Sequence, residues 1–527
     1  MIADPIAQGL ARGWNAHDAS RFGRDRTFAC DVVIVGTGAG GGTAAEILSE
    51  AGLKVVLVEE GPLRSSRDFK MLERDAYPQL YQESAGRRTK DKGIVILQGR
   101  AVGGSTTVNW TSSFRTPPVT LQYWRDHFGL DAYTPDALAP WFERMEHRLN
   151  IAPWSEPPNE NNAALARGAA ALGIPTAVIP RNVKGCYNLG YCGMGCPTNA
   201  KQSMLVTTIP AALDRGATLI SRARAQRVLF DGDRATGVEC AALDATGLRP
   251  GPHTIRITAR TVVVAGGAIN TPALLLRSKV PDPYGTLGKR TFLHPVVISA
   301  ATMPHTVAPF SGAPQSIYSD HFLATQGLDG PVGYKLEVPP VHPVLLAITT
   351  PGFGRDQAAL VAKLPDLQVI IALMRDGFHD RSRGGSVGLR SDGTPLLDYP
   401  ITDYLWDGAR RALKTMADIQ FAAGATSVIP IHEDAREVTS PAAAHALIDA
   451  LPMEILRASV VSAHVMGGCA MGGNPRSSVT DGNGRHHQLE NLYVFDGSAF
   501  PTSIGANPQL SVYGIVARNA ARLAHEL

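Results

Sequence analysis

The chain opens with short apolar runs that are separated by glycine-rich turns. The β-branched run at 32–35 is typical of a central parallel strand, and a second apolar run at 55–58 follows it. The segment from Thr43 to Ala51, between the two runs, has the pattern of a helix. Strand, helix and strand in this order predict a Rossmann-like α/β unit.

The turn after the first predicted strand carries Gly36, Gly38 and Gly41 in the spacing G-x-G-x-x-G. The first glycine allows a sharp turn, the second lets the backbone approach a pyrophosphate, and the third allows close helix packing. Glu59 ends the second strand, where a carboxylate can accept hydrogen bonds from ribose hydroxyls. These residues predict a dinucleotide site but do not distinguish FAD from NAD.

Further segments along the first half show strand or helix patterns. Residues 123–149 are predicted to be one helix, because Trp141, Phe142, Met145 and Leu149 form an apolar face. Another helix is expected at 204–215. Short strands are expected at 94–97, 217–220, 227–230 and 261–265.

The pattern changes between His294 and about Leu451, where apolar runs alternate with Pro/Gly loops. This alternation predicts an antiparallel sheet domain that covers the active site. Its expected elements are strands at 296–300, 344–348 and 367–373, a hairpin at 385–398 and a helix at 402–423.

Composition narrows the function class. The 527 residues are 44% hydrophobic and 18% charged, with a formal net charge of +3, so a nucleic-acid partner is not expected. We see no transmembrane-length apolar run and no secretory signal, and six cysteines do not make a disulfide framework. We therefore expect a cytoplasmic protein, and the composition leaves peripheral contact with the inner membrane open.

A second glycine turn follows the run at 94–97. It contains Gly99, Gly103 and Gly104, followed by Ser105 and Asn109. A plain Gly/Ser loop and a second contact to one extended cofactor both explain this stretch.

The two glycine motifs together resemble those of the glucose–methanol–choline (GMC) oxidoreductases, which carry FAD and oxidise alcohols. The resemblance implies that Glu59 holds the adenosine ribose, that residues from Arg100 to Ser105 line the pyrophosphate and ribityl chain, and that Asn109 lies beside the isoalloxazine ring. Some members attach FAD through a histidine in this motif; none lies between Gly99 and Arg115, so we expect non-covalent FAD. The resemblance also implies FAD contacts from Val228, Ala265, Asp496, Gly497, Pro508 and Gln509.

Three cysteines lie close together in the sequence, at Cys186, Cys192 and Cys196. Thiolates are soft ligands, so a metal or iron–sulfur site is one interpretation. Zinc and [4Fe–4S] clusters need four ligands, whereas a [3Fe–4S] cluster needs three. The segment more closely resembles a stretch of long-chain alcohol oxidases and related bacterial dehydrogenases that packs as a tight loop near the flavin, and we predict no metal. A disulfide remains a further alternative.

Alcohol oxidation by a flavin needs a base beside the hydroxyl group and a second polar group that holds the same oxygen. The family match places these roles on His464 and Asn507. Histidine suits the first role because its ordinary pKa of about 6.5 lets it accept a proton near neutral pH. His486 and His487 are expected to be exposed, and Cys469 to be a small buried residue.

We therefore predict an α/β FAD-binding domain at 28–118, 200–293 and 455–527, and an antiparallel-sheet (α+β) substrate domain at 119–199 and 294–454. The predicted reaction is oxidation of a medium- or long-chain primary alcohol, with oxygen, a quinone or a carrier protein as electron acceptor. The alternatives are a dehydrogenase of a sugar, sterol or aromatic alcohol, an iron–sulfur electron-transfer dehydrogenase, a hydroxynitrile lyase with structural FAD, and a non-catalytic flavin-binding protein.

Overall fold

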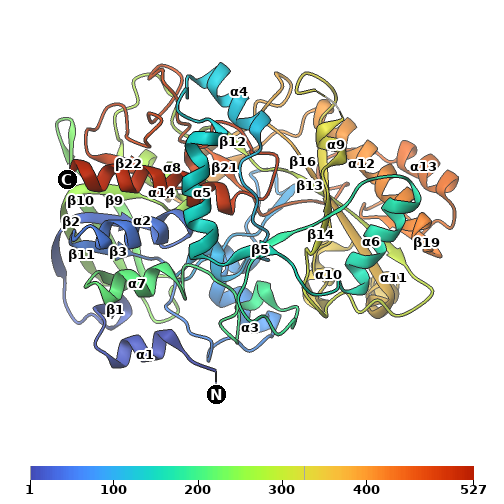
Figure 1. Ribbon diagram of the computed structural model, residues 1–527, viewed down its shortest axis with the longest axis horizontal. Helices are drawn as coiled ribbons and strands as arrows, with labels where there is room; N and C mark the ends of the chain where they lie inside the picture. The colour runs from blue at the N-terminus through green and yellow to red at the C-terminus, as the bar shows by residue number, and fades with distance from the viewer. Residues whose placement is uncertain (1, 326) are drawn as a thin grey trace.

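The computed structural model describes residues 2–325 and 327–527. Figure 1 shows two sheets side by side, each with its own helices. The sheet that contains β2, β3 and β11 lies on the left of this view, and the sheet that contains β13, β14 and β16 lies on the right. Helix α5 runs between them.

The first sheet is the predicted nucleotide-binding sheet. Its strands, in order across the sheet, are β1 (Ala16–Asp18), β8 (Thr218–Ser221), β3 (Val55–Val58), β2 (Arg26–Val35), β11 (Pro250–Val264), β10 (Arg234–Leu243) and β9 (Ala223–Asp231), and β22 (Leu492–Val494) pairs with β11. The pairs from β1 to β11 are parallel, and β9 and β10 are antiparallel additions. Val33 lies opposite both Val56 and Val262, so the apolar runs form the buried centre of the sheet.

Helices cover this sheet. The helices concerned are α2 (Ala39–Glu50), α5 (Pro135–Arg148), α7 (Thr208–Asp214), α8 (Gly267–Ser278) and α14 (Gln509–Glu526). Helix α14 packs on α2 and α5. Helix α2 begins four residues before the predicted start, because its first turn is built from glycines. A Cβ at Gly40 would lie 1.6 Å from the carbonyl oxygen of Phe495, so only glycine allows this approach.

The second sheet is mainly antiparallel, as predicted. Its order is β4 (Ile94–Ile96), β20 (Val460–Ser462), β13 (Val296–Thr302), β16 (Leu367–Met374), β15 (Tyr334–Glu337), β14 (Ile317–Ser319) and β6 (Ala177–Val178), with β19 (Ser427–Pro430) paired to β13. Helix α12 (Asp403–Ala422) packs on β13 and β16, and α6 (Glu160–Ala171) and α13 (Pro441–Ala450) pack on α12. The predicted long helix is therefore confirmed.

Two smaller sheets and several short helices complete the fold. The smaller sheets are β18 (Pro395–Asp398), β17 (Gly385–Leu389), β12 (Lys289–Phe292) and β21 (Met466–Gly467), and the pair β5 (Ile151–Pro153) and β7 (Pro180–Asn182). The other helices are α1 (Pro5–Ala11), α3 (Glu73–Leu80), α4 (Pro118–Phe128), α9 (His321–Ala324), α10 (Pro343–Thr349) and α11 (Gly354–Ala362), and the 3₁₀ turns are η1 (Ala19–Arg21), η2 (Gln82–Ala85), η3 (Gly104–Thr107), η4 (Cys192–Met194), η5 (Leu364–Asp366) and η6 (Gly497–Ala499). The predicted hairpin at 385–398 is confirmed by the pairing of β17 with β18.

Two predicted elements are wrong. The single helix at 123–149 is two helices, α4 and α5, because Gly129 adopts a left-handed φ of 64° that ends α4. The predicted strand at 344–348 lies in helix α10. The carboxylate of Glu73 accepts hydrogen bonds from the backbone N–H groups of Val344 and Leu345, at 2.7 and 2.8 Å, and so stabilises the start of this helix.

The predicted domain boundaries stay a prediction. Strands β4 and β20 fall in ranges predicted for the FAD-binding domain, yet they pair with each other in the second sheet. No helix in the two described ranges has the length and apolar character needed to span a bilayer.

Candidate functional site

A cavity of about 620 Å³ lies where the glycine turns approach the second sheet. Its volume is within the range of cofactor and ligand sites. The predicted site residues that line it are Gly36, Gly38, Glu59, Gly104, Ser105, Asn109, Ala265, His464, Asp496, Gly497, Asn507, Pro508 and Gln509. Residues far apart in the sequence thus meet around one space.

Four predicted contact residues do not line this cavity. Gly41 packs on the turn itself, since a Cβ there would lie 2.0 Å from the Gly36 carbonyl oxygen. Gly103 donates its N–H to Thr37 Oγ1 at 3.0 Å. Val228 belongs to β9; its side chain is buried, and its N–H donates to Ser278 Oγ at 2.8 Å. Residues 223–226 line the cavity in its place.

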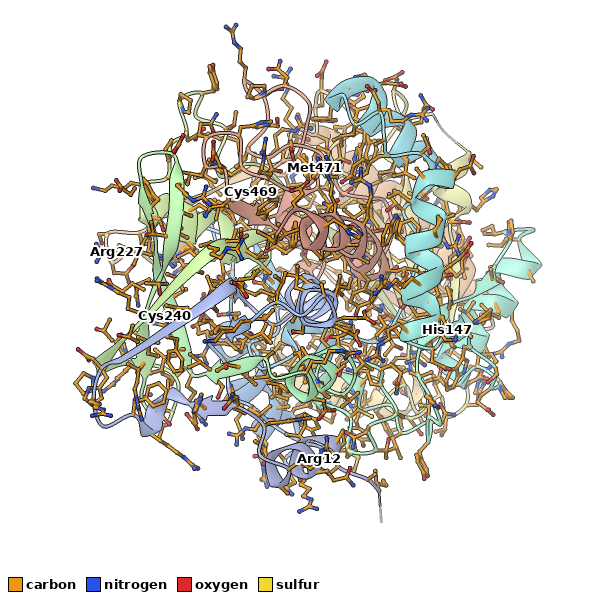
Figure 2. The ribbon with its side chains drawn as sticks, turned by 60° about the vertical axis from the view of Figure 1, so that its left-hand side comes forward. Arg12, His147, Arg227, Cys240, Cys469 and Met471 are labelled. Atoms are coloured by element: carbon orange, nitrogen blue, oxygen red, sulfur yellow. The ribbon has the colours of Figure 1, made fainter. Side chains whose placement is uncertain are left out.

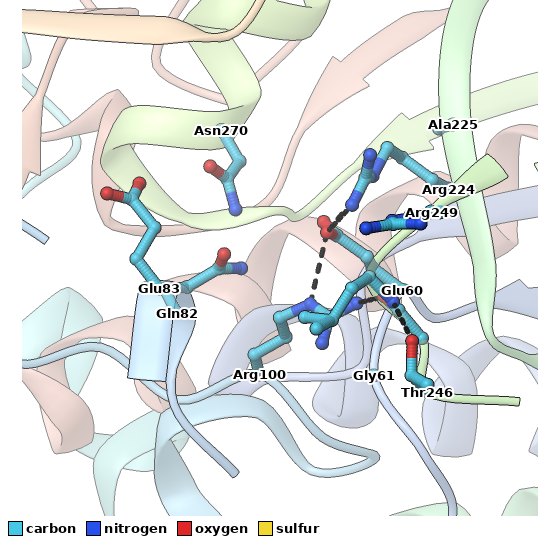
Figure 3. Close-up of polar contacts among 12 residues, drawn as sticks. Glu60, Gly61, Gln82, Glu83, Arg100, Arg224, Ala225, Thr246, Arg249 and Asn270 are labelled. Atoms are coloured by element: carbon cyan, nitrogen blue, oxygen red, sulfur yellow. Dashed lines mark hydrogen bonds and ion pairs between the residues drawn. The ribbon is translucent and has the colours of Figure 1, made fainter. Parts of the chain in front are cut away.

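Arg100, the fourth of these residues, is held by protein groups. Figure 3 shows its guanidinium beside the Glu60 carboxylate, which also contacts Arg224. Glu60 Oε1 lies 3.1 Å from Arg100 Nε and 3.0 Å from Arg224 Nη2. Burial acts to raise the pKa of Glu60, but the charges of Arg224 and Arg100 outweigh it and lower this pKa. Glu60 therefore stays ionised and holds both arginines, of which Arg224 lines the cavity.

Glu59 lies at the end of β3 with its carboxylate buried. One oxygen accepts hydrogen bonds from Thr37 Oγ1 and N, at 2.6 and 3.1 Å, and the other accepts from Gly61 N at 2.8 Å. Burial raises the pKa of Glu59, and the Thr37 hydrogen bond opposes this shift. The carboxylate is thus oriented in the wall of the cavity, where carboxylate oxygens retain capacity to accept from ribose hydroxyls.

The glycine turns form a cradle that fits an extended dinucleotide. A Cβ on Gly104 would lie 2.7 Å from Gly38 Cα, and a Cβ on Gly36 would lie 2.3 Å from the Ala265 carbonyl oxygen. Helix α2 has Gly38 at its N-cap, and no side chain caps it. Its first N–H groups and positive dipole end therefore face the cavity, as a pyrophosphate requires.

Lys201 joins the cysteine segment to the second glycine turn. Its buried Nζ donates to the carbonyl oxygens of Thr107, Asn109 and Cys192, at 2.9, 2.6 and 2.7 Å. Burial lowers the pKa of Lys201 to about 8. Asn109 Nδ2 in turn donates to Gln509 Oε1 at 2.7 Å, which connects this wall to the start of α14.

The three cysteines of this segment are free thiols. Within residues 2–325 and 327–527, no group of three or more His, Cys, Asp or Glu side chains is arranged to hold a metal ion. Figure 2 labels two other cysteines, Cys240 and Cys469. Both are buried, as predicted for Cys469.

His464 lines the cavity and contacts a second histidine. Its Nδ1 lies 3.1 Å from Nδ1 of His294, which is fully buried. Burial, followed by the charge of Lys335, lowers the pKa of His464 to about 3. Burial and the neighbouring His464 likewise hold the pKa of His294 well below its ordinary value. Both rings are therefore neutral at physiological pH.

Asn507 is oriented by a buried charged group. Its Nδ2 donates to Glu337 Oε2 at 3.1 Å, and its Oδ1 has no hydrogen-bond partner among the described residues. Glu337 also accepts from Gln315 at 2.9 Å and lies 3.6 Å from the Lys335 ammonium. The ammonium is 3.1 Å from the centre of the Phe114 ring, a cation–π contact.

The exposed position predicted for His486 is wrong, because its side chain is buried. Its backbone N–H donates to the Leu492 carbonyl oxygen at 2.8 Å. His487 is half-buried and contacts Ser478 Oγ at 2.9 Å. The turn that carries them packs beside β22 instead of projecting into solvent.

The sequence alone does not single out His294, Lys335 and Glu337 as site residues. A signal exists for the last two. Lys335 and Glu337 occupy alternate positions of strand β15 and so share one face of it, whereas the apolar Tyr334 and Leu336 point to the other face. Charged residues at alternate positions of a fully buried strand indicate a paired internal site. His294 had no comparable local signal.

Comparisons with known proteins identify the family of this chain. The family models described as GMC oxidoreductase match residues 77–296 and 380–515, and a model described as an FAD binding domain matches residues 31–69. An uncharacterized GMC-type oxidoreductase of Mycobacterium tuberculosis is 32% identical, over 97% of this chain and 80% of that protein.

A long-chain-alcohol oxidase of Arabidopsis thaliana is 28% identical, over 92% of this chain and 67% of that protein. Among solved structures, pyridoxine 4-oxidase has a TM-score of 0.69 at 19% identity, covering 94% of this chain and 99% of that one. The predicted enzyme class, FAD-dependent oxidation of CH–OH groups, is confirmed at the level of the family. The chain belongs to the GMC oxidoreductase family and uses FAD as its cofactor.

Proposed function

We propose that this enzyme oxidises a medium- or long-chain aliphatic primary alcohol to the aldehyde, with His464 as the base and Asn507 as its partner. The observation that carries the proposal is that both side chains line one cavity together with the dinucleotide cradle. FAD, when bound there, supplies the acceptor for the hydride from the carbinol carbon.

The His464 ring is neutral and only one of its nitrogens is occupied, so the other can accept a proton, although the burial that lowers its pKa also makes it a weaker base than an exposed histidine. At 3.1 Å, one of the two facing Nδ1 atoms of His464 and His294 must donate and the other must accept. If His464 Nδ1–H donates to His294, the Nε2 lone pair of His464 is free to take the hydroxyl proton. The base role therefore requires this tautomer, in which His294 Nε2 carries a hydrogen that no described residue accepts.

Asn507 suits the positioning of the same oxygen. Its hydrogen bond to Glu337 fixes the plane of the side-chain amide, so Oδ1 and the second Nδ2 hydrogen keep one orientation. The second Nδ2 hydrogen and the free Oδ1 remain available to the alcohol hydroxyl. A pre-oriented partner lowers the entropic cost of holding the carbon in place for transfer.

The choice of alcohol rests on two weaker supports. Tyr81, Trp110 and Val465 give the cavity an apolar part of its lining. The relatives named long-chain-alcohol oxidases match most of this chain. We further propose that FAD is bound non-covalently, because the turn from Gly99 to Arg115 has no histidine, and that oxygen, a quinone or a carrier protein accepts the electrons.

An anaerobic titration tests the proposal. The flavin absorbance of the purified enzyme, near 450 nm, is followed during addition of ethanol, octanol, dodecanol, benzyl alcohol or glucose. We expect bleaching by octanol and dodecanol at lower concentration than by the others. Bleaching only by glucose or benzyl alcohol would contradict the substrate class, and a fully oxidised flavin with every alcohol would favour a lyase.

A further inference from the structure

Exposed apolar side chains gather on three segments that meet at the start of helix α10. The segments are residues 67–75, 184–191 and 343–356, which we call the apolar surface. The Glu73 carboxylate accepts hydrogen bonds from the N–H groups of Val344 and Leu345, and His342 Nε2 contacts the Gly190 carbonyl oxygen at 3.3 Å. Figure 1 shows α3 and α10 close together near the lower edge of the molecule.

Among the residues that the structure describes, nearly half of the exposed large apolar side chains lie on this surface. They are Met71, Leu72, Tyr187, Leu189, Val344, Ile348 and Phe353. Phe353 is 89% exposed and Ile348 is 51% exposed. Phe353 follows Gly352 and precedes Gly354, both with positive φ, and the adjoining helix α11 buries none of its residues. Such a concentration marks an interaction surface.

The charges around these side chains are mainly basic. The exposed basic residues of the three segments are Arg67, Lys70, Arg74, Lys184 and Arg355, and the exposed acidic ones are Asp68 and Asp356. Arg67 contacts the buried Asp4 and Arg74 contacts Asp75, but both guanidinium groups remain largely in solvent. The chain as a whole is nearly balanced, at 50 basic and 47 acidic residues, so this excess is local.

We propose that the apolar surface docks on the headgroup region of an anionic lipid bilayer. Aromatic and aliphatic tips flanked by Lys and Arg are the combination that interfacial binding uses, because apolar burial and attraction to acidic headgroups add. No membrane-spanning helix is needed for this contact. The enzyme would bind reversibly through a face that presents Phe353 and Ile348 to the lipid.

The surface is connected to the cavity. Tyr81, which lines the cavity, donates its hydroxyl to the Gly193 carbonyl at 2.7 Å, and Gly193 follows the exposed Tyr187–Leu189 stretch. Docking would therefore place the cavity wall near the lipid phase, in which long-chain alcohols dissolve. Access of a long-chain alcohol from the lipid to the cavity rests on the proposed function, whereas the docking itself does not.

Vesicle sedimentation tests the docking without turnover. The FAD-loaded enzyme is mixed with vesicles of phosphatidylcholine alone or with about one third phosphatidylserine, the acidic lipid whose charge attracts Lys and Arg. We expect binding to the acidic vesicles, and a partition coefficient at least tenfold lower for the double variant Ile348→Ser, Phe353→Ser. Lys70→Gln with Arg355→Gln should weaken binding to acidic vesicles by about tenfold.

Val119→Ser is the matched control. Val119 is 45% exposed at the start of α4, which lies at the opposite edge of the molecule in Figure 1. This variant should bind vesicles like the wild type, and retained flavin absorbance and unfolding temperature show that each variant is folded. Equal sedimentation of the wild type and the Ile348/Phe353 variant would overturn the proposal. So would a concentration-dependent dimer that only this variant loses, since the surface would then join two copies.

Discussion

The Nδ1 atoms of His294 and His464 face each other at 3.1 Å, although 170 positions separate them in the sequence. The rings are stacked with an angle of 29° between their planes. Because only one Nδ1 can carry the shared hydrogen, the tautomer of His294 is coupled to that of His464. If His464 is the base, as we propose, His294 is a positioning residue that acts through it.

Replacement of His294 should separate positioning from chemistry. We expect His294→Ala to slow anaerobic flavin reduction by about 10- to 100-fold, because the base loses its orienting acceptor. His294→Asn should recover much of the rate, since an Asn oxygen can accept the same hydrogen bond and Asn tolerates the φ of 48° at this position. Stopped-flow reduction measures both, and equal rates for the two variants would contradict the positioning role.

Replacement of His464 should remove the base but not the cofactor. His464→Ala is expected to retain FAD and to lower the reduction rate by about 10²-fold or more, the contribution of a positioned base. His487→Ala is the control, because His487 is half-buried and bonds Ser478 outside the cavity lining. A His464→Ala rate within about threefold of wild type would refute the assignment.

The pH dependence of flavin reduction follows from the pKa of His464. Burial lowers this pKa to about 3, so the ring is neutral at pH 7.5 and still neutral at pH 5. We expect the reduction rate to fall less than twofold between these pH values. A base with the ordinary pKa of about 6.5 would lose about 30-fold over the same interval. A loss of that size would show that burial does not lower the pKa of His464.

The buried Lys335–Glu337 pair should matter more for stability than an exposed pair. Lys335→Met leaves the Glu337 carboxylate in the interior without its cation, and we expect the free energy of unfolding to fall by about 3 kcal/mol or more. The control is Lys363→Met, which removes a half-exposed contact to Glu437 and should cost less than about 1 kcal/mol. Urea unfolding of both holoenzyme variants gives the comparison; similar losses would contradict it.

Gly104 should be needed for FAD affinity. A Cβ there would lie 2.7 Å from Gly38 Cα and push the two glycine turns apart, so we expect Gly104→Ala to weaken FAD binding at least tenfold. Gly52→Ala is the matched control, because Gly52 also has a positive φ, of 83°, but nothing lies within 4 Å of its Cβ position. Titration of the apo-proteins with FAD measures the difference, and equal affinities would remove the cradle argument.

The sequence by itself determined the elements whose signals are local. The apolar runs at 32–35 and 55–58 became adjacent parallel strands, because a strand buried on both faces needs continuous apolar residues. The glycine spacing predicted the cradle, since backbone contact excludes a Cβ wherever the turns meet. His464, Asn507 and most of the predicted cofactor residues line one cavity, and their individual roles remain predictions.

Only the tertiary structure decided the features that depend on distant partners. The first N–H groups of helix α10 donate to Glu73, which lies 271 positions before Val344, and the apolar run that predicts a strand carries no sign of this distant contact. The low pKa of His464, the fixed amide of Asn507 and the partner His294 all arise from burial and from contacts between residues far apart in the sequence. Burial and long-range hydrogen bonds have no local pattern, because they exist only once the chain has folded.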